Sequence, residues 1–122
     1  MNQKMKVTLP NGMTGYSVLS LYADGSTRLD LRDSEDHSPL ATCTSNCVTY
    51  VEPDCIVVKD YSENVGMANA LYDSGVVTGT VRKLEANRWG IEYPVMRLNP
   101  DLASRAIELK QQFNEENKED NE

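Results

Sequence analysis

Three cysteines and the only histidine lie in one stretch of the chain, and these residue types could together hold a zinc ion. Thiolate and imidazole groups are the usual zinc ligands, so His37, Cys43, Cys47 and Cys55 could form a Cys3His site. The cysteine spacing is C-x3-C-x7-C, without the paired CxxC motifs that are typical of zinc sites. The cysteines also occupy apolar positions of expected strands, where a free cysteine packs as a small hydrophobic residue. We therefore expect core thiols, no metal and no other cofactor, with the zinc site as the alternative.

His37 could also act as a general base with Asp36 or Glu35, or form a nucleophilic pair with a cysteine. It lies in an acidic loop that ends at Pro39, where a solvated side chain is the ordinary outcome. A catalytic pair needs spatial proximity, which this spacing does not indicate. We therefore predict no catalytic residue, and a small enzyme that uses His37 and the cysteines is the alternative function.

Two aromatic residues are better candidates for contact with a protein partner. Tyr61 lies beside the start of an expected helix, and Trp89 opens an expected edge strand. Exposed aromatic side chains are common anchors of protein interfaces. Glu63 and Asn64 share the corner of Tyr61, so all four residues are candidate binding residues.

The net charge of −7 disfavours one class of partner and leaves another open. Residues 1–100 carry 12 acids and 9 bases, a net charge of −3, whereas residues 101–122 carry 7 acids and 3 bases, a net charge of −4. Because binding to a phosphate backbone requires surplus Lys and Arg, we expect no direct contact with nucleic acid. A basic protein partner, or mimicry of an acidic one, fits the charge.

The length and hydropathy of the chain indicate a single cytoplasmic domain. A chain of 122 residues leaves little room for two domains, and it can bury a sufficient core without metals or disulfides. No run approaches the roughly 18 apolar residues of a membrane span, and the first residues lack the apolar run of a signal peptide. We therefore expect reduced cysteines and no membrane contact. The oligomeric state is not indicated.

The first element expected to position these residues is a β-hairpin over residues 16–32. Its turn contains Ala23-Asp24-Gly25, and the strand register decides which turn forms. A two-residue loop would pair Leu19 with Asp30 and place a charge on the apolar face. A three-residue loop pairs Leu19 with Leu29 and leaves the glycine left-handed at the bulge. We predict the three-residue loop.

Runs of apolar and β-branched residues between turn signals predict further strands. They cover Lys6 to Leu9, Leu40 to Cys43, Cys47 to Val51, Cys55 to Lys59, Val76 to Leu84 and Trp89 to Tyr93. Pro94 donates no hydrogen bond, so it predicts that the last strand ends at a sheet edge. The predicted fold is α+β, a mostly antiparallel sheet of about five or six strands with one short internal helix and a C-terminal helix.

The short internal helix is expected to begin with a capping box at Asp60-Tyr61-Ser62-Glu63. In such a box the Asp60 carboxylate accepts from the Glu63 N–H, and the Glu63 carboxylate reaches back to the Asp60 N–H. Gly66 inside the helix weakens it by ~1 kcal/mol relative to alanine, which marks a close approach or a bend. Gly75 is placed to end the helix in a left-handed conformation.

The C-terminal helix is expected to begin with Asn99 as its cap and to carry one apolar seam. The seam consists of Leu102, Ala106, Leu109 and Phe113. It either packs on the sheet of its own domain, which we favour, or pairs with another helix. Residues 1–113 then form the single domain, and residues 114–122 form a solvated, disordered acidic tail. Leu102, Leu109 and Phe113 are the candidate binding residues on this helix.

One segment of the chain resembles a known family. The run from Val57 to Met67 contains Lys-Asp-Tyr-Ser-Glu-Asn-x-Gly, and Ser74-Gly75-Val76-Val77 and Glu92-Tyr93-Pro94-Val95 follow it. Over about residues 40–98 this pattern is similar to small uncharacterised proteins of mobile genetic elements, with domain of unknown function 4313. That family has no assigned activity, but the resemblance implies an accessory protein of a mobile element. It also implies that Asp60 to Gly66 is more than a helix cap.

The charge, the motifs and the resemblance together favour a non-enzymatic protein–protein interaction or regulatory module of a mobile genetic element. One version is an acidic inhibitor of a host protein that binds nucleic acid. A protein is therefore the expected partner.

Overall fold

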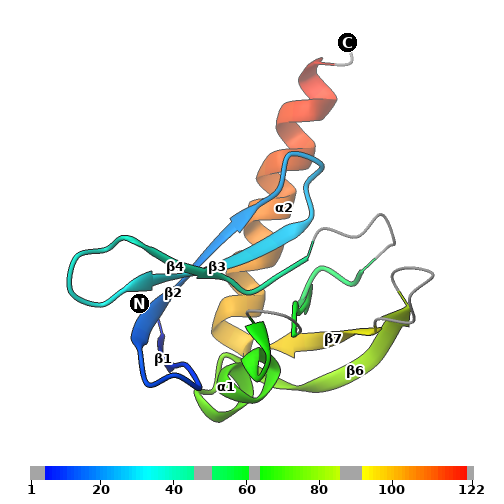
Figure 1. Ribbon diagram of the computed structural model, residues 1–122. Helices are drawn as coiled ribbons and strands as arrows, with labels where there is room; N and C mark the ends of the chain where they lie inside the picture. Colours follow the sequence, from blue (N-terminus) through cyan, green and yellow to red (C-terminus); the bar gives the residue numbers. More distant parts are fainter. Residues whose placement is uncertain (1–4, 46–50, 61–63, 86–91, 121–122) are drawn as a thin grey trace.

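The computed structural model describes residues 5–45, 51–60, 64–85 and 92–120, which form two antiparallel sheets and two helices (Figure 1). The first sheet, ordered β1-β2-β3-β4, contains β1 (Lys6–Thr8), β2 (Thr14–Leu21), β3 (Thr27–Asp33) and β4 (Pro39–Thr42). The second sheet, ordered β5-β7-β6, contains β5 (Cys55–Val57), β6 (Val77–Glu85) and β7 (Glu92–Leu98). The helices are α1 (Met67–Asp73) and α2 (Pro100–Asp120).

The predicted α+β class, with a short internal helix and a C-terminal helix, is confirmed. The described strands number seven and divide between two sheets, where the sequence predicted about five or six strands in one. Between the two sheets the only pairing of the described residues is an isolated bridge of Thr44 with Val58. The sequence pattern of a strand predicts that strand alone. The division of the strands into sheets depends on which strands pair, and the pattern does not specify that.

The β2–β3 hairpin has the predicted three-residue turn. Leu19 pairs with Leu29 and Ser17 with Leu31, so both leucines of β3 face the core. Gly25 adopts a φ of +89°, the left-handed conformation that the turn requires. The register therefore follows from the apolar alternation and the Asp-Gly turn together.

The prediction that Pro94 ends an edge strand is wrong. β7 continues through Pro94 and is the central strand of its sheet, paired with β5 on one side and β6 on the other. Pro94 faces Val58, just beyond the last residue of β5, and its carbonyl accepts from the Val58 N–H at 2.9 Å. The proline therefore stands where the ladder with β5 has already ended, and no hydrogen bond within β5 is lost.

One hydrophobic core joins both sheets and both helices. Its largest fully buried side chains come from β1, β3, β5, β6, β7, α1 and α2, and include Leu29, Leu31, Ile56, Leu71, Leu98 and Leu102. A smaller apolar cluster, with Cys55, Val57, Tyr93 and Val95, joins β5 and β7 separately. The core holds the two sheets together where backbone pairing does not.

The seam of α2 packs on its own domain, as favoured from the sequence. Leu102 and Ala106 belong to the core and are 1% and 0% exposed. The helix does not end near Phe113 but continues to Asp120, and its C-terminal turns extend past the tip of the β2–β3 hairpin (Figure 1). The division of the chain at residue 113 stays a prediction.

Helix α1 begins later than predicted, although Asp60 does cap it. The Asp60 Oδ1 accepts from the Gly66 N–H at 2.6 Å, and its Oδ2 accepts from the Ala68 N–H at 3.4 Å. Gly66 is the N-cap residue of α1, the residue directly before its first helical residue, and has a φ of +92°. The predicted partner, Glu63, lies outside the described residues. Asp60 therefore stabilises a helix start that lies six residues further along the chain.

The end of α1 confirms the predicted glycine cap. Gly75 has a φ of +80°, its N–H donates to the Tyr72 carbonyl, and the Val76 N–H donates to the Leu71 carbonyl. This is a Schellman motif, and the buried Val76 and Leu71 both belong to the core. The chain therefore turns from the helix into β6 with its last carbonyls satisfied.

Asn99 caps α2 as predicted and also joins the two helices. Its Oδ1 accepts from the Leu102 N–H at 2.9 Å, and its Nδ2 donates to the Gly75 carbonyl at 2.8 Å. The start of α2 is therefore fixed to the end of α1.

Among the residues that the structure describes, no helix is long and apolar enough to cross a membrane.

Candidate functional site

The structure places four of the seven predicted binding residues. Tyr61, Glu63 and Trp89 lie outside the described residues. Asn64 lies just before α1, while the remaining three lie along α2. The predicted residues therefore belong to two separate regions of the molecule.

Asn64 is buried rather than presented to a partner. It is 6% exposed, and its Nδ2 donates to the Thr42 carbonyl at 2.7 Å. This hydrogen bond fixes the segment before α1 to the end of β4. The role of Asn64 in the motif is therefore structural, because its hydrogen bond fixes one wall of the neighbouring surface.

That surface is a groove of about 540 Å³, which we call the motif groove. It is lined by Leu9, Pro10, Asn11, Met13, Leu40, Ala41, Thr42, Lys59, Asn64, Val65 and Met67. These residues come from the turn between β1 and β2, from β4, and from the segment that leads into α1. The groove combines apolar side chains with polar ones and directly adjoins the Asp60–Gly66 motif.

Two large apolar side chains stand exposed at the motif groove. Met13 is 45% exposed and Val65 is 66% exposed. Single exposed apolar residues are ordinary on a protein surface, but apolar side chains that gather on one concave surface are typical of binding sites. Methionine adapts its shape to different partners. The sequence analysis missed both residues, although a valine between the polar Asn64 and Gly66 was a usable signal.

A close contact between Gly66 and the Pro10 ring holds the walls of the motif groove. A Cβ atom at Gly66 would lie 2.7 Å from the Pro10 Cγ, closer than any real contact, and the φ of +92° favours glycine in any case. Only a glycine therefore lets the β1–β2 turn approach the start of α1. We expected Gly66 inside the helix, with a close approach or a bend. It lies before the helix instead, and of the two alternatives the structure shows the close approach, to Pro10.

The second region is the outer part of α2. Leu102 lies in the core, whereas Leu109 and Phe113 are half-buried. The Phe113 ring lies against the hairpin turn, where a Cβ at Gly25 would be 2.7 Å from its Cε1. Phe113 therefore joins the helix to the turn of the β2–β3 hairpin.

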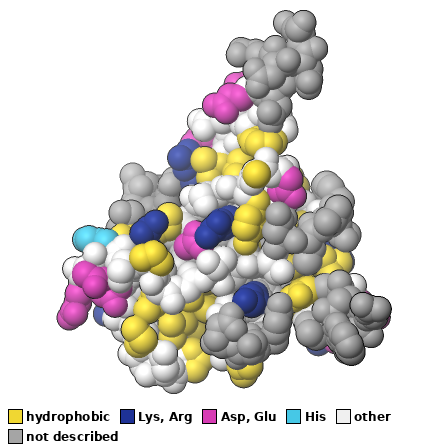
Figure 2. All heavy atoms as spheres, turned by 45° about the horizontal axis from the view of Figure 1, so that its top comes forward, with side chains coloured by type: hydrophobic (Ala, Val, Ile, Leu, Met, Phe, Trp, Pro, Cys, Tyr) yellow, Lys and Arg dark blue, Asp and Glu magenta, His cyan; other side chains and the backbone are white. Residues whose placement is uncertain are grey.

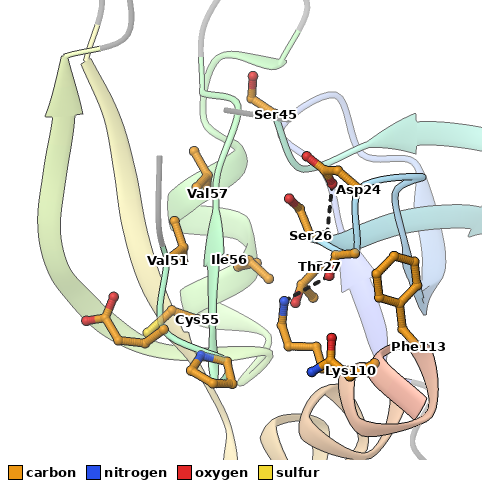
Figure 3. A pocket seen from close by; sticks show the side chains of 14 residues that line it. Asp24, Ser26, Thr27, Ser45, Val51, Cys55, Ile56, Val57, Lys110 and Phe113 are labelled. Carbon is orange, nitrogen blue, oxygen red and sulfur yellow. Dashed lines mark hydrogen bonds between the residues drawn. The ribbon is translucent and has the colours of Figure 1, made fainter. Parts of the chain in front are cut away.

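Beside Phe113 lies a pocket of about 360 Å³, which we call the hairpin pocket (Figure 3). It is lined by Asp24, Gly25, Ser26, Thr27, Ser45, Val51, Glu52, Pro53, Cys55, Ile56, Val57, Lys110, Phe113 and Asn114. Lys110 reaches from α2 to the hairpin and donates from Nζ to the Gly25 carbonyl at 3.0 Å. Burial lowers the pKa of Lys110, although the nearby Asp24 opposes this change.

Thr27 is an unusual member of the hairpin pocket. Its side chain is 7% exposed, and its Oγ1 has no hydrogen-bond partner among the described residues. An unsatisfied buried hydroxyl costs about 1–3 kcal/mol. Threonine at this position is therefore poorly explained by packing alone.

The described cysteines are core thiols, as favoured from the sequence. Cys43 and Cys55 are free and are 0% and 1% exposed, while Cys47 lies outside the described residues. Burial raises the pKa of Cys43 to about 12 and that of Cys55 to about 11, the latter also through the neighbouring Asp54. Both side chains therefore carry neutral thiols, which are poor nucleophiles and poor metal ligands.

His37 lies on the surface, whereas Cys43 and Cys55 are buried. It is exposed, has a φ of +63°, and its Nδ1 lies 2.9 Å from the Tyr16 Oη. Within the described ranges no group of three or more His, Cys, Asp or Glu side chains could hold a metal ion. The geometry therefore gives no support to the zinc site or to a Cys-His pair with Cys43 or Cys55.

Charged side chains are unevenly placed on the surface. Figure 2 shows acidic side chains beside His37 and along the projecting helix, with basic side chains between them. Several basic residues are paired: Arg82 with Glu52 at 2.6 Å, and Arg97 with Asp54 at 3.1 Å. Arg82 lowers the pKa of Glu52 through their hydrogen bonds.

Comparison with protein-family models, curated proteins and solved structures found no match to this chain. The resemblance to domain of unknown function 4313 therefore stays a prediction. The assignment of function depends on the geometry of the two surfaces.

Proposed function

We propose that this protein is a non-enzymatic protein-binding module whose partner docks on the motif groove. The observation that carries this proposal is the pair of exposed apolar side chains, Met13 and Val65, on one concave surface. A partner that covers them would remove apolar area from water, the main favourable term in protein association.

The fixed walls of the motif groove support the proposal. Asn64, Asp60 and Gly66 hold the segment before α1 through short hydrogen bonds and a close contact with Pro10. A surface that is ordered before binding loses less conformational freedom when the partner arrives. On this proposal the function of the Asp60–Gly66 motif is to shape the docking surface.

We further propose that the protein is a regulatory product of a mobile genetic element and acts as an acidic inhibitor of a host protein. The resemblance of residues 40–98 supports the first part, and the net charge of −7 supports the second. The binding of a basic partner to such a chain is strengthened by long-range attraction, which salt screens. Affinity for the partner should therefore fall steeply between low and physiological salt.

The test is capture of the partner from cells of the organism that encodes the protein, followed by titration of the purified pair. Val65→Asp and Met13→Asp each place a charge on the motif groove and should weaken binding at least about tenfold, because a buried unpaired charge is costly. Val81→Asp is the matched control, since Val81 is 39% exposed on β6, outside the groove.

Equal binding by the groove variants and the Val81→Asp control would exclude the motif groove as the docking surface. A complex that is insensitive to salt would exclude the acidic-inhibitor version while leaving the docking surface intact. The two parts of the proposal therefore fail separately.

A further inference from the structure

The hairpin pocket differs from the motif groove because it contains a cation and a buried hydroxyl. Among the described residues that line it, Lys110 is the only basic one. Its ammonium group can donate three hydrogen bonds, and one of these goes to the Gly25 carbonyl. It forms no ion pair with the described residues, so a half-buried positive charge faces the pocket with donors to spare.

The Thr27 hydroxyl is a second, independent sign of a ligand. The side chain is more than nine-tenths buried, lines the pocket, and leaves its Oγ1 without a partner among the described residues. Figure 3 shows Thr27 between Ser26 and Lys110, where the hairpin meets α2. A ligand atom beside Lys110 would lie near this hydroxyl and could satisfy it.

The hairpin pocket also has apolar walls. Ile56 of β5 and the Phe113 ring line it, and Figure 3 shows these two side chains on opposite sides of the pocket. Pockets of roughly 300–1,000 Å³ with apolar walls and a few polar groups are typical of small-molecule sites. The hairpin pocket fits this description, and Thr27 and Lys110 are polar groups at its hairpin end.

The neighbouring acids limit the charge of the ligand. Asp24 and Glu52 also line the pocket, and although Arg82 pairs with Glu52, both carboxylates repel an anion. A single lysine can balance one negative charge in this setting, but not two. A monocarboxylate matches the site better than a phosphate, because its two oxygens can accept from the ammonium and from a hydroxyl at once.

We propose that the hairpin pocket binds a small monocarboxylate with an apolar body, held by Lys110 and Thr27 at its charged end and by Ile56 and Phe113 along its body. This site is separate from the motif groove and does not depend on the proposed protein partner. A bound ligand would join the hairpin, β5 and α2, which are three elements far apart in the sequence.

The probe is octanoate, compared with 1-octanol at the same concentrations. Binding is followed through the backbone amide NMR shifts of the full chain. Octanoate should shift the amides around Gly25, Thr27, Ile56 and Lys110, and it should bind at least about tenfold more tightly than octanol, because charge-assisted hydrogen bonds are the stronger ones. Inorganic phosphate should shift these amides little.

Two substitutions assign the polar contacts. Lys110→Met keeps the apolar stem and should weaken octanoate binding about tenfold while leaving octanol unchanged. Thr27→Val removes only the hydroxyl and should weaken octanoate binding about threefold. Lys83→Met, an exposed lysine on β6, is the matched control and should bind as the unmodified chain does.

Three results would overturn the proposal. They are equal affinity for octanoate and octanol, octanoate shifts confined to other surfaces, and unchanged octanoate binding by Lys110→Met. If Lys110→Met does not fold, Lys110→Arg keeps the charge on a longer head group. Octanoate binding by that variant should survive within about threefold, since arginine also donates to carboxylates. Complete loss there would count against a charge-based site.

Discussion

The motif groove and the hairpin pocket differ in the contacts that hold their walls. The groove is held by a glycine that lies against a proline ring and by the buried Asn64 side-chain amide on a backbone carbonyl, and it exposes two apolar side chains. The pocket is closed by long side chains, Lys110 and Phe113, which reach from α2 to the hairpin turn. The walls of the groove are therefore stiff, while the pocket is closed by adaptable side chains, one of which is a lysine.

This difference indicates two kinds of recognition in one small domain. A stiff surface with exposed apolar side chains suits a protein partner, because little conformational freedom is lost on binding. A pocket that two long side chains close can enclose a small ligand and satisfy its charge. Substitutions in the walls of the two regions should therefore change the free energy of unfolding by different amounts.

The largest effect is expected from Gly66→Ala in the motif groove. The change combines the strain of a φ of +92° with a clash against the proline ring, and should lower the free energy of unfolding by about 3 kcal/mol. Urea unfolding measures it. Gly12→Ala is the control, because its φ is +88° but a Cβ there would meet nothing within 4 Å. Equal losses in the two variants would show that the contact with Pro10 contributes nothing.

Asn64→Ala should cost less than the glycine substitution. It removes the hydrogen bond to the Thr42 carbonyl and leaves that acceptor unsatisfied, which should lower the free energy of unfolding by about 2 kcal/mol. Asn69→Ala on the exposed side of α1 is the matched control and should change it by less than about 0.5 kcal/mol. A small effect at Asn64 would mean that the groove wall is not fixed by this bond.

Gly25→Ala tests the hairpin pocket in the same way. The φ of +89° and the distance of 2.7 Å match those at Gly66, but the neighbour is the half-buried Phe113 ring, which can rotate away. We expect a loss of about 1–2 kcal/mol, smaller than at Gly66, and a smaller loss still in a Phe113→Leu background. A loss equal to that of Gly66→Ala would remove the contrast between a stiff and an adaptable surface.

The smallest effect is expected from Thr27→Val without ligand. Because the Thr27 Oγ1 has no partner among the described residues, its removal should leave the free energy of unfolding unchanged or raise it by up to about 1 kcal/mol. Thermal unfolding without ligand measures it. A loss of more than about 1 kcal/mol would show that the hydroxyl is already satisfied in the folded protein.

Local features were predictable from the sequence because neighbouring residues determine them. The hairpin register, the left-handed Gly75 and the Asn99 cap all follow from short-range hydrogen bonds and steric limits. The buried Leu102 followed from helical periodicity. The candidate sites were less predictable, since neither Met13 nor Lys110 carries a signal that distinguishes it from other surface residues.

By itself, the sequence determined the α+β class, the turn of the first hairpin, the end of α1 at Gly75 and the start of α2 at Asn99, because each depends on residues close together in the chain. Only the tertiary structure decided that β7 is central despite Pro94, that Asp60 caps the helix beyond Gly66, and that Pro10 meets Gly66. These outcomes depend on the packing of segments distant in the sequence, which no local preference specifies. Both proposed sites lie where such segments meet.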